Sequence, residues 1–215
     1  MDNIFLEKKE FRKKIKLQLS QLEKNFFVQK SEEICKNILS WEIYQKAKTI
    51  LFYMPLKSEP NIFKIIEDSF SQKKECYIPK ITDEITMKFF LLEKEKSILE
   101  QVESGFYGIL EPKENLPLLQ IEDLQKKDDI LIFVPAMAFD INKNRIGKGK
   151  GFYDRFLSKI FENYQENITL AGISFDCFIY DKIPTETNDM KVDYIISIHR
   201  CLWPPRVIYA MEVLC

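Results

Sequence analysis

The chain alternates short apolar runs with segments in which apolar residues recur every three or four positions. Apolar and β-branched runs that end at proline or at polar turns are typical of strands, and they occur at residues 49–54, 75–78, 85–92, 130–134, 168–173 and 192–198. The first two runs end at Pro55 and Pro79. Helical spacing predicts helices over residues 11–22, 28–39, 61–70 and 152–161.

Strands that alternate with helices predict an α/β fold with a mostly parallel sheet and helices on both faces, which makes three layers. The 215 residues and the 46% hydrophobic content suit one domain with a sizeable core. In such folds ligands bind beyond the carboxyl ends of the strands. The turns that follow the predicted strands are therefore where functional residues are expected.

Charge and cysteine content narrow the function classes. With 32 Lys and Arg against 33 Asp and Glu, the chain has no global field that would attract nucleic acid or an anionic membrane, so neither partner is expected. The five cysteines include no Cys-x-x-Cys pair, which favours reduced thiols and a cytoplasmic location. The apolar triplet Ile4-Phe5-Leu6 is too short for a signal sequence, and no apolar run approaches a membrane span.

A glycine-rich segment, RIGKGKGFYDRFL, precedes and enters a predicted helix at residues 145–157. Its glycines can adopt positive φ and let a ligand approach the backbone, while its lysines add positive charge. These residues are Gly147, Gly149 and Gly151, with Lys148 and Lys150 between them. The pattern indicates a pocket for a phosphate-bearing ligand, and the alternative is a flexible surface turn. A Walker A loop does not fit the spacing, and a dinucleotide fingerprint fails because the preceding strand ends well before the glycines.

Carboxylates near this segment predict a metal site. Asp154 lies in the first turn of the predicted helix beside Tyr153, where it could hold Mg²⁺ through water and phosphate oxygens. The alternative is that Asp154 only complements the helix dipole. Asp189 and Asp193 precede or open the last predicted strand, and one of them could join Asp154 at the metal. The usual role of a lone Asp in a loop is an Asx-turn, which is the alternative for both.

Two further features point to the ligand side of the sheet. Lys8, Arg12 and Lys16 recur four residues apart and give the first predicted helix a basic stripe, for which the alternative is a solvated face. Glu59 follows the first predicted strand and places a carboxylate at its carboxyl end. The alternative for Glu59 is a helix-start residue before Asn61.

Together, the segments RIGKGKGFYDRFL, FVPAMAFD, AGISFD and IPTETNDMKVD closely resemble the 5-formyltetrahydrofolate cyclo-ligase family, also called the 5,10-methenyltetrahydrofolate synthetases. Their order and spacing match as well. The N-terminal KKEFR resembles the family's nucleotide-binding helix, and the loop from Met54 to Glu59 resembles its folate loop. The resemblance runs from about Glu7 to Ser197. It implies a single domain over residues 1–198 and leaves residues 199–215 as an unmatched C-terminal tail. The single histidine, His199, is therefore not expected to be catalytic.

The resemblance implies a monomeric α/β enzyme, a ligase that forms a C–N bond. It would use ATP and Mg²⁺ to cyclise 5-formyltetrahydrofolate to 5,10-methenyltetrahydrofolate, with release of ADP and phosphate. In the family's mechanism the formyl oxygen attacks the γ-phosphate, and N10 then attacks the carbon of the resulting imidate-like phosphate. Phosphorylation makes the oxygen a leaving group, and catalysis of this kind depends on positioning and charge neutralisation.

Carried over to the matching positions, the resemblance implies the following site residues. The catalytic residues are Lys150 and Arg145, which would stabilise the transferring phosphoryl group. The ATP-binding residues are Lys8, Arg12, Arg145, Ile146, Gly147, Lys148, Gly149, Lys150, Gly151, Phe152 and Tyr153. The substrate-binding residues are Met54, Glu59, Tyr107, Lys148, Gly149, Lys150, Gly151 and Phe152, and the Mg²⁺ ligands are Asp154 and Asp189. Phe152 stands where relatives commonly have Tyr, and Tyr107, expected to stack on the substrate, stands where they often have Trp.

Two other function classes share parts of this pattern. Sugar-phosphate isomerases and CoA-transferase-like enzymes have similar sheets and phosphate loops, but they do not need Lys8, Arg12 and a metal pair. Nucleotide dependence distinguishes them from the cyclo-ligases. A non-catalytic folate or nucleotide sensor is expected to lack part of the set Lys150, Asp154 and Asp189. All three are present, which favours an enzyme.

Overall fold

The computed structural model describes residues 2–162 and 167–199. The helices are α1 (Asp2–Gln21), α2 (Lys24–Ser40), α3 (Glu42–Lys46), α4 (Phe63–Ser71), α5 (Ile98–Gln101) and α6 (Phe152–Phe161). The strands are β1 (Thr49–Leu51), β2 (Glu75–Ile81), β3 (Met87–Leu91), β4 (Val102–Ser104), β5 (Leu110–Pro112), β6 (Ile130–Val134), β7 (Ala138–Asp140), β8 (Arg145–Ile146), β9 (Ile168–Ile173), β10 (Ile179–Tyr180) and β11 (Tyr194–Ile196). Three short 3₁₀ helices among the described residues span Phe106–Gly108, Ile121–Lys126 and Asp176–Phe178.

The main sheet has six strands in the order β11-β9-β6-β1-β2-β3. Its strands pair in parallel except β3, which runs antiparallel to β2 and forms one edge. The predicted mostly parallel α/β sheet is therefore confirmed. The register places Leu51 of β1 beside Tyr77 of β2 and Ile132 of β6, so the three parallel strands end toward the same edge of the sheet, where β2 and β6 continue past the end of β1.

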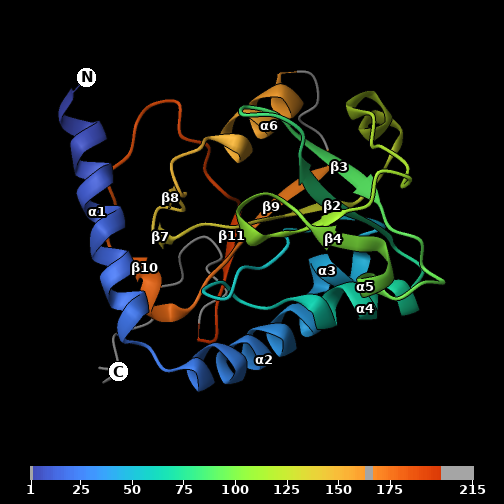
Figure 1. Cartoon of the computed structure of the whole chain (residues 1–215), viewed down its shortest axis with the longest axis horizontal. Helices are drawn as coiled ribbons and strands as arrows, with labels where there is room; N and C mark the ends of the chain where they lie inside the picture. Colours follow the sequence, from blue (N-terminus) through green and yellow to red (C-terminus); the bar gives the residue numbers. More distant parts are fainter. Residues whose placement is uncertain (1, 163–166, 200–215) are drawn as a thin grey trace.

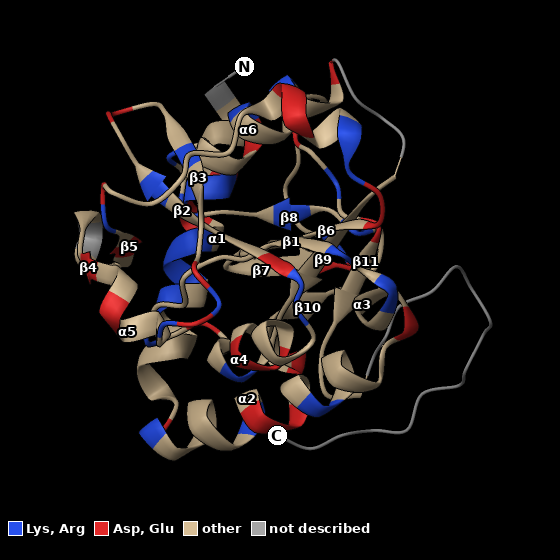
Figure 2. Cartoon of the chain, turned by 90° about the vertical axis from the view of Figure 1, so that its right-hand side faces the viewer, with Lys and Arg blue, Asp and Glu red and all other residues tan. Residues whose placement is uncertain are grey.

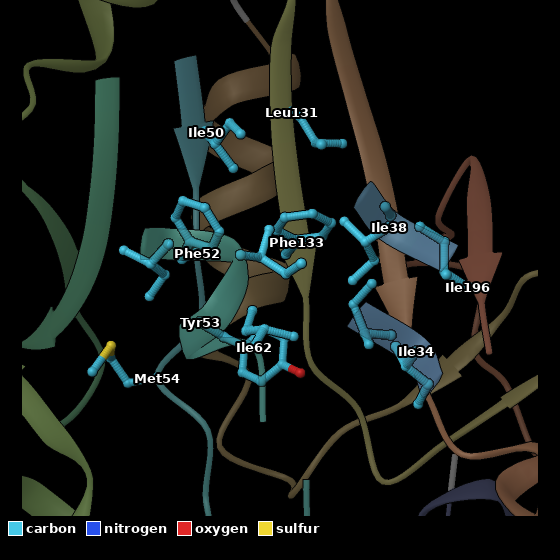
Figure 3. Packing of buried hydrophobic residues seen from close by; sticks show 14 of the residues in the cluster. Ile34, Ile38, Ile50, Phe52, Tyr53, Met54, Ile62, Leu131, Phe133 and Ile196 are labelled. Carbon is cyan, nitrogen blue, oxygen red and sulfur yellow. The ribbon is translucent and has the colours of Figure 1, made fainter. Parts of the chain in front are cut away.

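Helices cover both faces of this sheet, as Figure 1 shows: α2, α3 and α4 lie on one side and α6 on the other. The pleat sends alternate side chains of β1 and β6 to opposite faces. Phe52, just after β1, and Phe133 pack on the side of α2 and α4, with ring centroids 5.5 Å apart (Figure 3). Leu51 and Ile132 join the opposite cluster with residues of α6. Burial on both faces explains why these strands are continuously apolar.

Two smaller sheets stand beside the main one. The strands β10, β7 and β8 form a three-stranded sheet, and β4 and β5 form an antiparallel hairpin. Helix α1 runs along the three-stranded sheet at one end of the molecule (Figure 1). Phe11 of α1 packs edge-on against Tyr180 of β10, and Gln18 accepts a hydrogen bond from the Tyr180 hydroxyl at 2.6 Å. These contacts fix the basic stripe of α1 relative to the loops that leave β7 and β8.

The predicted element bounds are right for β6, β9 and α6, and the structure corrects others. Strand β2 does not end at Pro79 but continues to Ile81. Proline has no backbone N–H to donate, but β2 has no partner residue in β1 beyond Tyr77, so Pro79 breaks no hydrogen bond to β1. The first strand ends at Leu51, and the last covers Tyr194–Ile196 and not 192–198. Helix α4 begins at Phe63, whose N–H is accepted by the Asn61 side chain.

Surface charge and helix hydropathy agree with the composition. Lys and Arg are interspersed with Asp and Glu over the helices and loops in Figure 2. Within residues 2–162 and 167–199, no helix combines the length and the apolar character that a membrane crossing requires. Residues 200–215 of the predicted tail lie outside the described residues. His199 is described, and its Nδ1 lies 3.5 Å from a carboxylate oxygen of Asp176.

Candidate active site

A cavity of about 310 Å³ opens at the carboxyl ends of β1, β2 and β6. Residues that follow β1 and β6, the end of β2, and the segment that joins β8 to α6 form its walls. One residue pair on α1, Lys8 and Arg12, closes it from the side. This is the edge at which ligands bind in parallel α/β sheets.

The glycine loop, residues 147–151, wraps one wall of the cavity. Gly149 and Gly151 have φ of 90° and 68°, in the left-handed region that side chains disfavour. Gly147 does not have positive φ, so the expectation of positive φ holds for two of the three glycines. Arg12 donates from Nε to the Gly147 carbonyl at 2.8 Å, and Arg155 donates from Nη2 to the Lys150 carbonyl at 2.8 Å. An arginine therefore holds each end of this loop.

A buried arginine and a half-buried carboxylate form the base of the cavity. Arg145 is 5% exposed and its Nη2 pairs with Oδ1 of Asp154 in the first turn of α6. The Nε of Arg145 is buried without a hydrogen-bond partner. Asp154 does lie at the helix N-terminus, but the ion pair makes its contact with Arg145 more specific than a dipole interaction.

Lys8 binds the second predicted metal ligand. Its Nζ lies 2.8 and 2.6 Å from the two carboxylate oxygens of Asp189 and 2.9 Å from Glu186. Lys8 is 7% exposed, so this end of the basic stripe is not a solvated face. Asp189 also accepts from the Glu186 N–H at 2.7 Å, a bond that holds its loop but is not the Asx-turn of the alternative, because the donor precedes Asp189 in the chain. Asp189 therefore holds its loop and lines the cavity with the same side chain.

Glu59 joins the 54–59 loop to the glycine loop. Its Oε1 accepts from Lys148 Nζ at 2.6 Å, and its Oε2 accepts from the Leu56 N–H at 3.0 Å. Because α4 starts at Phe63 and uses Asn61 as its local acceptor, Glu59 does not cap that helix. The pair spans 89 positions of sequence and connects two walls of one cavity.

Two tyrosine hydroxyls are buried beside these charges. Tyr53 donates to the Pro60 carbonyl at 2.6 Å and fixes the end of the 54–59 loop. The Tyr153 hydroxyl is buried without a hydrogen-bond partner in the structure. Burial raises the pKa of Tyr153, with nearby Glu59 adding to the rise and Arg145 opposing it. A neutral, unpartnered O–H at a cavity wall is suited to donate to a ligand.

A model of the 5-formyltetrahydrofolate cyclo-ligase family matches residues 5–198. The chain belongs to this family. Among curated cyclo-ligases, it is 27% identical to the 5-formyltetrahydrofolate cyclo-ligase of Mus musculus over 88% of this chain and 92% of that protein. It is 29% identical to a probable 5-formyltetrahydrofolate cyclo-ligase of Schizosaccharomyces pombe, over 89% and 95% of the two chains.

A solved cyclo-ligase-type structure has the same fold. The chain superposes on the NMR structure of 5,10-methenyltetrahydrofolate synthetase from Aquifex aeolicus with a TM-score of 0.74 and 25% identity. The match covers 94% of this chain and 96% of that one. The fold of the cyclo-ligase family, and with it the family resemblance of the sequence, is thereby confirmed.

The cavity of this cyclo-ligase-family chain collects the predicted site residues from four separate regions of the sequence. Those that line it are Lys8, Arg12, Met54, Glu59, Arg145, Ile146, Gly147, Lys148, Gly149, Lys150, Gly151, Phe152, Tyr153, Asp154 and Asp189. The backbone of Tyr107 belongs to the short 3₁₀ helix Phe106–Gly108, and its side chain lies outside the described part of the structure. The roles assigned to all of these residues stay predictions.

Other lining residues were not named as site residues, although some lie in the turns after predicted strands where functional residues were expected. They are Tyr53, Leu56, Pro79, Ile81, Met87, Ile109, Glu111, Pro135 and Ala136. Most are apolar residues next to strand ends, and only the expectation that ligands bind there could have drawn attention to them. Glu111 lies in a short strand without a periodic pattern, and its place in the cavity depends on how the β4–β5 hairpin packs.

The acidic residues of the cavity fit a hard cation held mainly by a ligand. Within the described ranges, no group of three or more His, Cys, Asp and Glu forms a metal cage. Asp154 and Asp189 both line the cavity and offer carboxylate oxygens, the donors that Mg²⁺ prefers. Mg²⁺ usually takes only one or two protein carboxylates when phosphate oxygens supply other positions, so two suffice.

Proposed function

We propose that this chain is an ATP- and Mg²⁺-dependent 5-formyltetrahydrofolate cyclo-ligase, which forms 5,10-methenyltetrahydrofolate, ADP and phosphate. The observation that carries the proposal is the family match over residues 5–198, joined to a cavity that gathers cations, carboxylates and an apolar wall at one sheet edge. The family match disfavours a sugar-phosphate isomerase or a CoA-transferase. A cytoplasmic location and a monomeric state stay predictions.

The chemistry requires an activated formyl oxygen. The formyl oxygen takes the γ-phosphoryl group of ATP and ADP leaves. N10 then forms a bond to the former formyl carbon, loses its proton, and expels phosphate as the carbon–oxygen bond breaks. Both steps move negative charge over phosphate oxygens, so the protein contributes chiefly by orienting two substrates and neutralising charge.

The glycine loop and its neighbours would hold the triphosphate. Lys150 lies on that loop and lines the cavity, and Arg145 lies at its base with an unpartnered Nε. We assign both to the transferring phosphoryl group. Lys8 and Arg12 reach the same cavity from α1, where Arg12 lies against Gly149 and is suited to bind phosphate oxygens in a fork.

Asp154 and Asp189 are the residues that would hold Mg²⁺. Each is paired with a cation in the structure, Arg145 and Lys8 respectively. If the two carboxylates held Mg²⁺, Arg145 and Lys8 would be available to bind phosphate oxygens. The metal supplies charge neutralisation at the phosphates, and the carboxylates with Lys8 and Arg145 set the position of the phosphate chain.

The opposite wall would hold the folate. Met54 lines the cavity and is 3% exposed, and Glu59 lines it from the same loop. Pro79, Ile81 and Phe152 add an apolar surface suited to a flat ring. Phe152 has no hydroxyl, so it can contribute only packing. The Glu59–Lys148 pair then lies where the nucleotide and folate regions meet.

The direct test is to mix the purified protein with 5-formyltetrahydrofolate, ATP and Mg²⁺ and to follow the near-ultraviolet absorbance of the methenyl product. ADP is measured in parallel and should form in equal amount. Omission of ATP or of Mg²⁺ should abolish the signal, and Lys150→Ala serves as the active-site control. Absence of product from folded wild-type protein, or product formation that does not need ATP, would refute the proposal.

A further inference from the structure

A further carboxylate lies in the wall of the cavity that we assign to the folate. Glu111, in β5, is 3% exposed and lines the cavity together with Pro79, Ile81 and Ile109. Its Oε1 accepts one hydrogen bond, from the Ile81 N–H at the end of β2, at 3.1 Å. Pro79, Ile81 and Ile109 are apolar, and Gly105 packs against the carboxyl group, where an added Cβ would overlap with Oε2, so burial of this charge is costly.

Glu111 differs from the other carboxylates that line the cavity. Glu59, Asp154 and Asp189 are each paired with Lys148, Arg145 and Lys8, respectively. In the part of the chain that the structure describes, no Lys or Arg lies within ion-pair distance of Glu111. A carboxylate has about four acceptor positions, and the Ile81 N–H fills one of them. Glu111 therefore has unused acceptor capacity beside the cavity.

We propose that Glu111 binds the amino-pyrimidine edge of the reduced pterin, which rests on the proposed function. That edge carries two adjacent donors, the 2-amino group and the N3–H, whose parallel directions match the two oxygens of a carboxylate. Oε1 can accept one of them beside Ile81, and Oε2 the other. Glu59 reaches the same pterin from the 54–59 loop and would take other donors. Glu111 thus contributes to the choice of a 2-amino-4-oxopteridine ligand.

If Glu111 had only a structural role, the effect of its substitution on folate binding would differ. If the side chain served only to attach the β4–β5 hairpin to β2, then Glu111→Gln would change little, because an amide oxygen still accepts from the Ile81 N–H. Glu103→Gln is the matched control. Glu103 lies on the same hairpin and pairs with Lys80 at 3.2 Å, and it does not line the cavity.

The experiment measures calorimetric binding of 5-formyltetrahydrofolate and of a non-hydrolysable ATP analogue to wild type, Glu111→Gln and Glu103→Gln, with the melting temperature of each. In Glu111→Gln we expect folate binding to weaken about 10- to 100-fold, the range for a hydrogen bond to a charged group. ATP-analogue binding and melting temperature should stay as in wild type. Glu103→Gln should match wild type throughout.

A folate analogue that lacks the 2-amino group tests the contact itself. Wild type should bind this analogue at least about tenfold more weakly than the parent folate, and Glu111→Gln should show a smaller difference. Equal folate affinity in Glu111→Gln and wild type would overturn the proposal. So would an equal loss of both ligands with a lowered melting temperature, or no discrimination by wild type. Wild type that binds no folate would instead refute the proposed function.

Discussion

Replacement of Gly151 by Ala should destabilise the protein, and the structure gives the approximate size of the loss. Gly151 has φ of 68° and is the residue before α6. An L side chain in this left-handed region costs about 1–2 kcal/mol. The added Cβ would also lie 2.7 Å from Nη1 of Arg155, so the guanidinium must move and loses its bond to the Lys150 carbonyl. That exposed bond adds at most about 0.5–1 kcal/mol.

We therefore expect Gly151→Ala to lower the free energy of unfolding by about 2 kcal/mol. In a chain of this length the melting temperature falls by about 4–8 °C. Gly149→Ala carries similar backbone strain but meets Arg12 Cζ at 3.3 Å, and we expect a loss of about 1–2 kcal/mol. Gly147→Ala is the control, because its φ is not positive and its nearest contact, Arg145 Nη1 at 3.5 Å, is ordinary.

Equilibrium urea unfolding, followed by far-ultraviolet circular dichroism, measures these differences, provided that the slope with urea stays the same in all variants. Gly147→Ala should lie within about 0.5 kcal/mol of wild type. Gly151→Asn should recover part of the loss, because Asn tolerates the left-handed region better. The reasoning is refuted if Gly151→Ala is as stable as wild type, or if Gly147→Ala is destabilised to the same extent.

Three further predictions concern charge. Lys150→Ala should reduce turnover at saturating ATP by about 10²-fold with unchanged folding, and near-normal turnover would remove Lys150 from the mechanism. Asp154→Asn and Asp189→Asn should each raise the Mg²⁺ concentration needed for activity, with a double variant far from additive, and an unchanged Mg²⁺ titration would leave that residue as a loop or helix-start residue. Burial raises the pKa of the Cys76 thiol to about 12, so the thiolate is scarce at pH 8. Mass spectrometry should find native Cys76 unlabelled by iodoacetamide when half-buried Cys177 has reacted, and equal labelling would contradict this.

The sequence by itself determined the elements whose signal is local. The runs 130–134 and 168–173 are apolar throughout because β6 and β9 are covered on both faces, and their predicted bounds are those of the structure. Helix α6 was equally clear, since glycines precede it and its buried Phe156, Leu157 and Ile160 follow helical spacing. The glycine loop was visible for the same reason: its chemistry lies in consecutive residues.

Only the tertiary structure decided what depends on how distant segments meet. Strand β2 passes through Pro79 because Pro79 has no partner residue in β1. The sequence around Pro79 does not show where the pairing with β1 ends. Lys8 pairs with Asp189 across 181 positions, and Lys148 with Glu59 across 89. Glu111 lines the cavity because its hairpin packs on β2. Hydrophobic period is a property of neighbouring residues, whereas the partner of a charge is chosen by the path of the chain, and that path is set by the packed core.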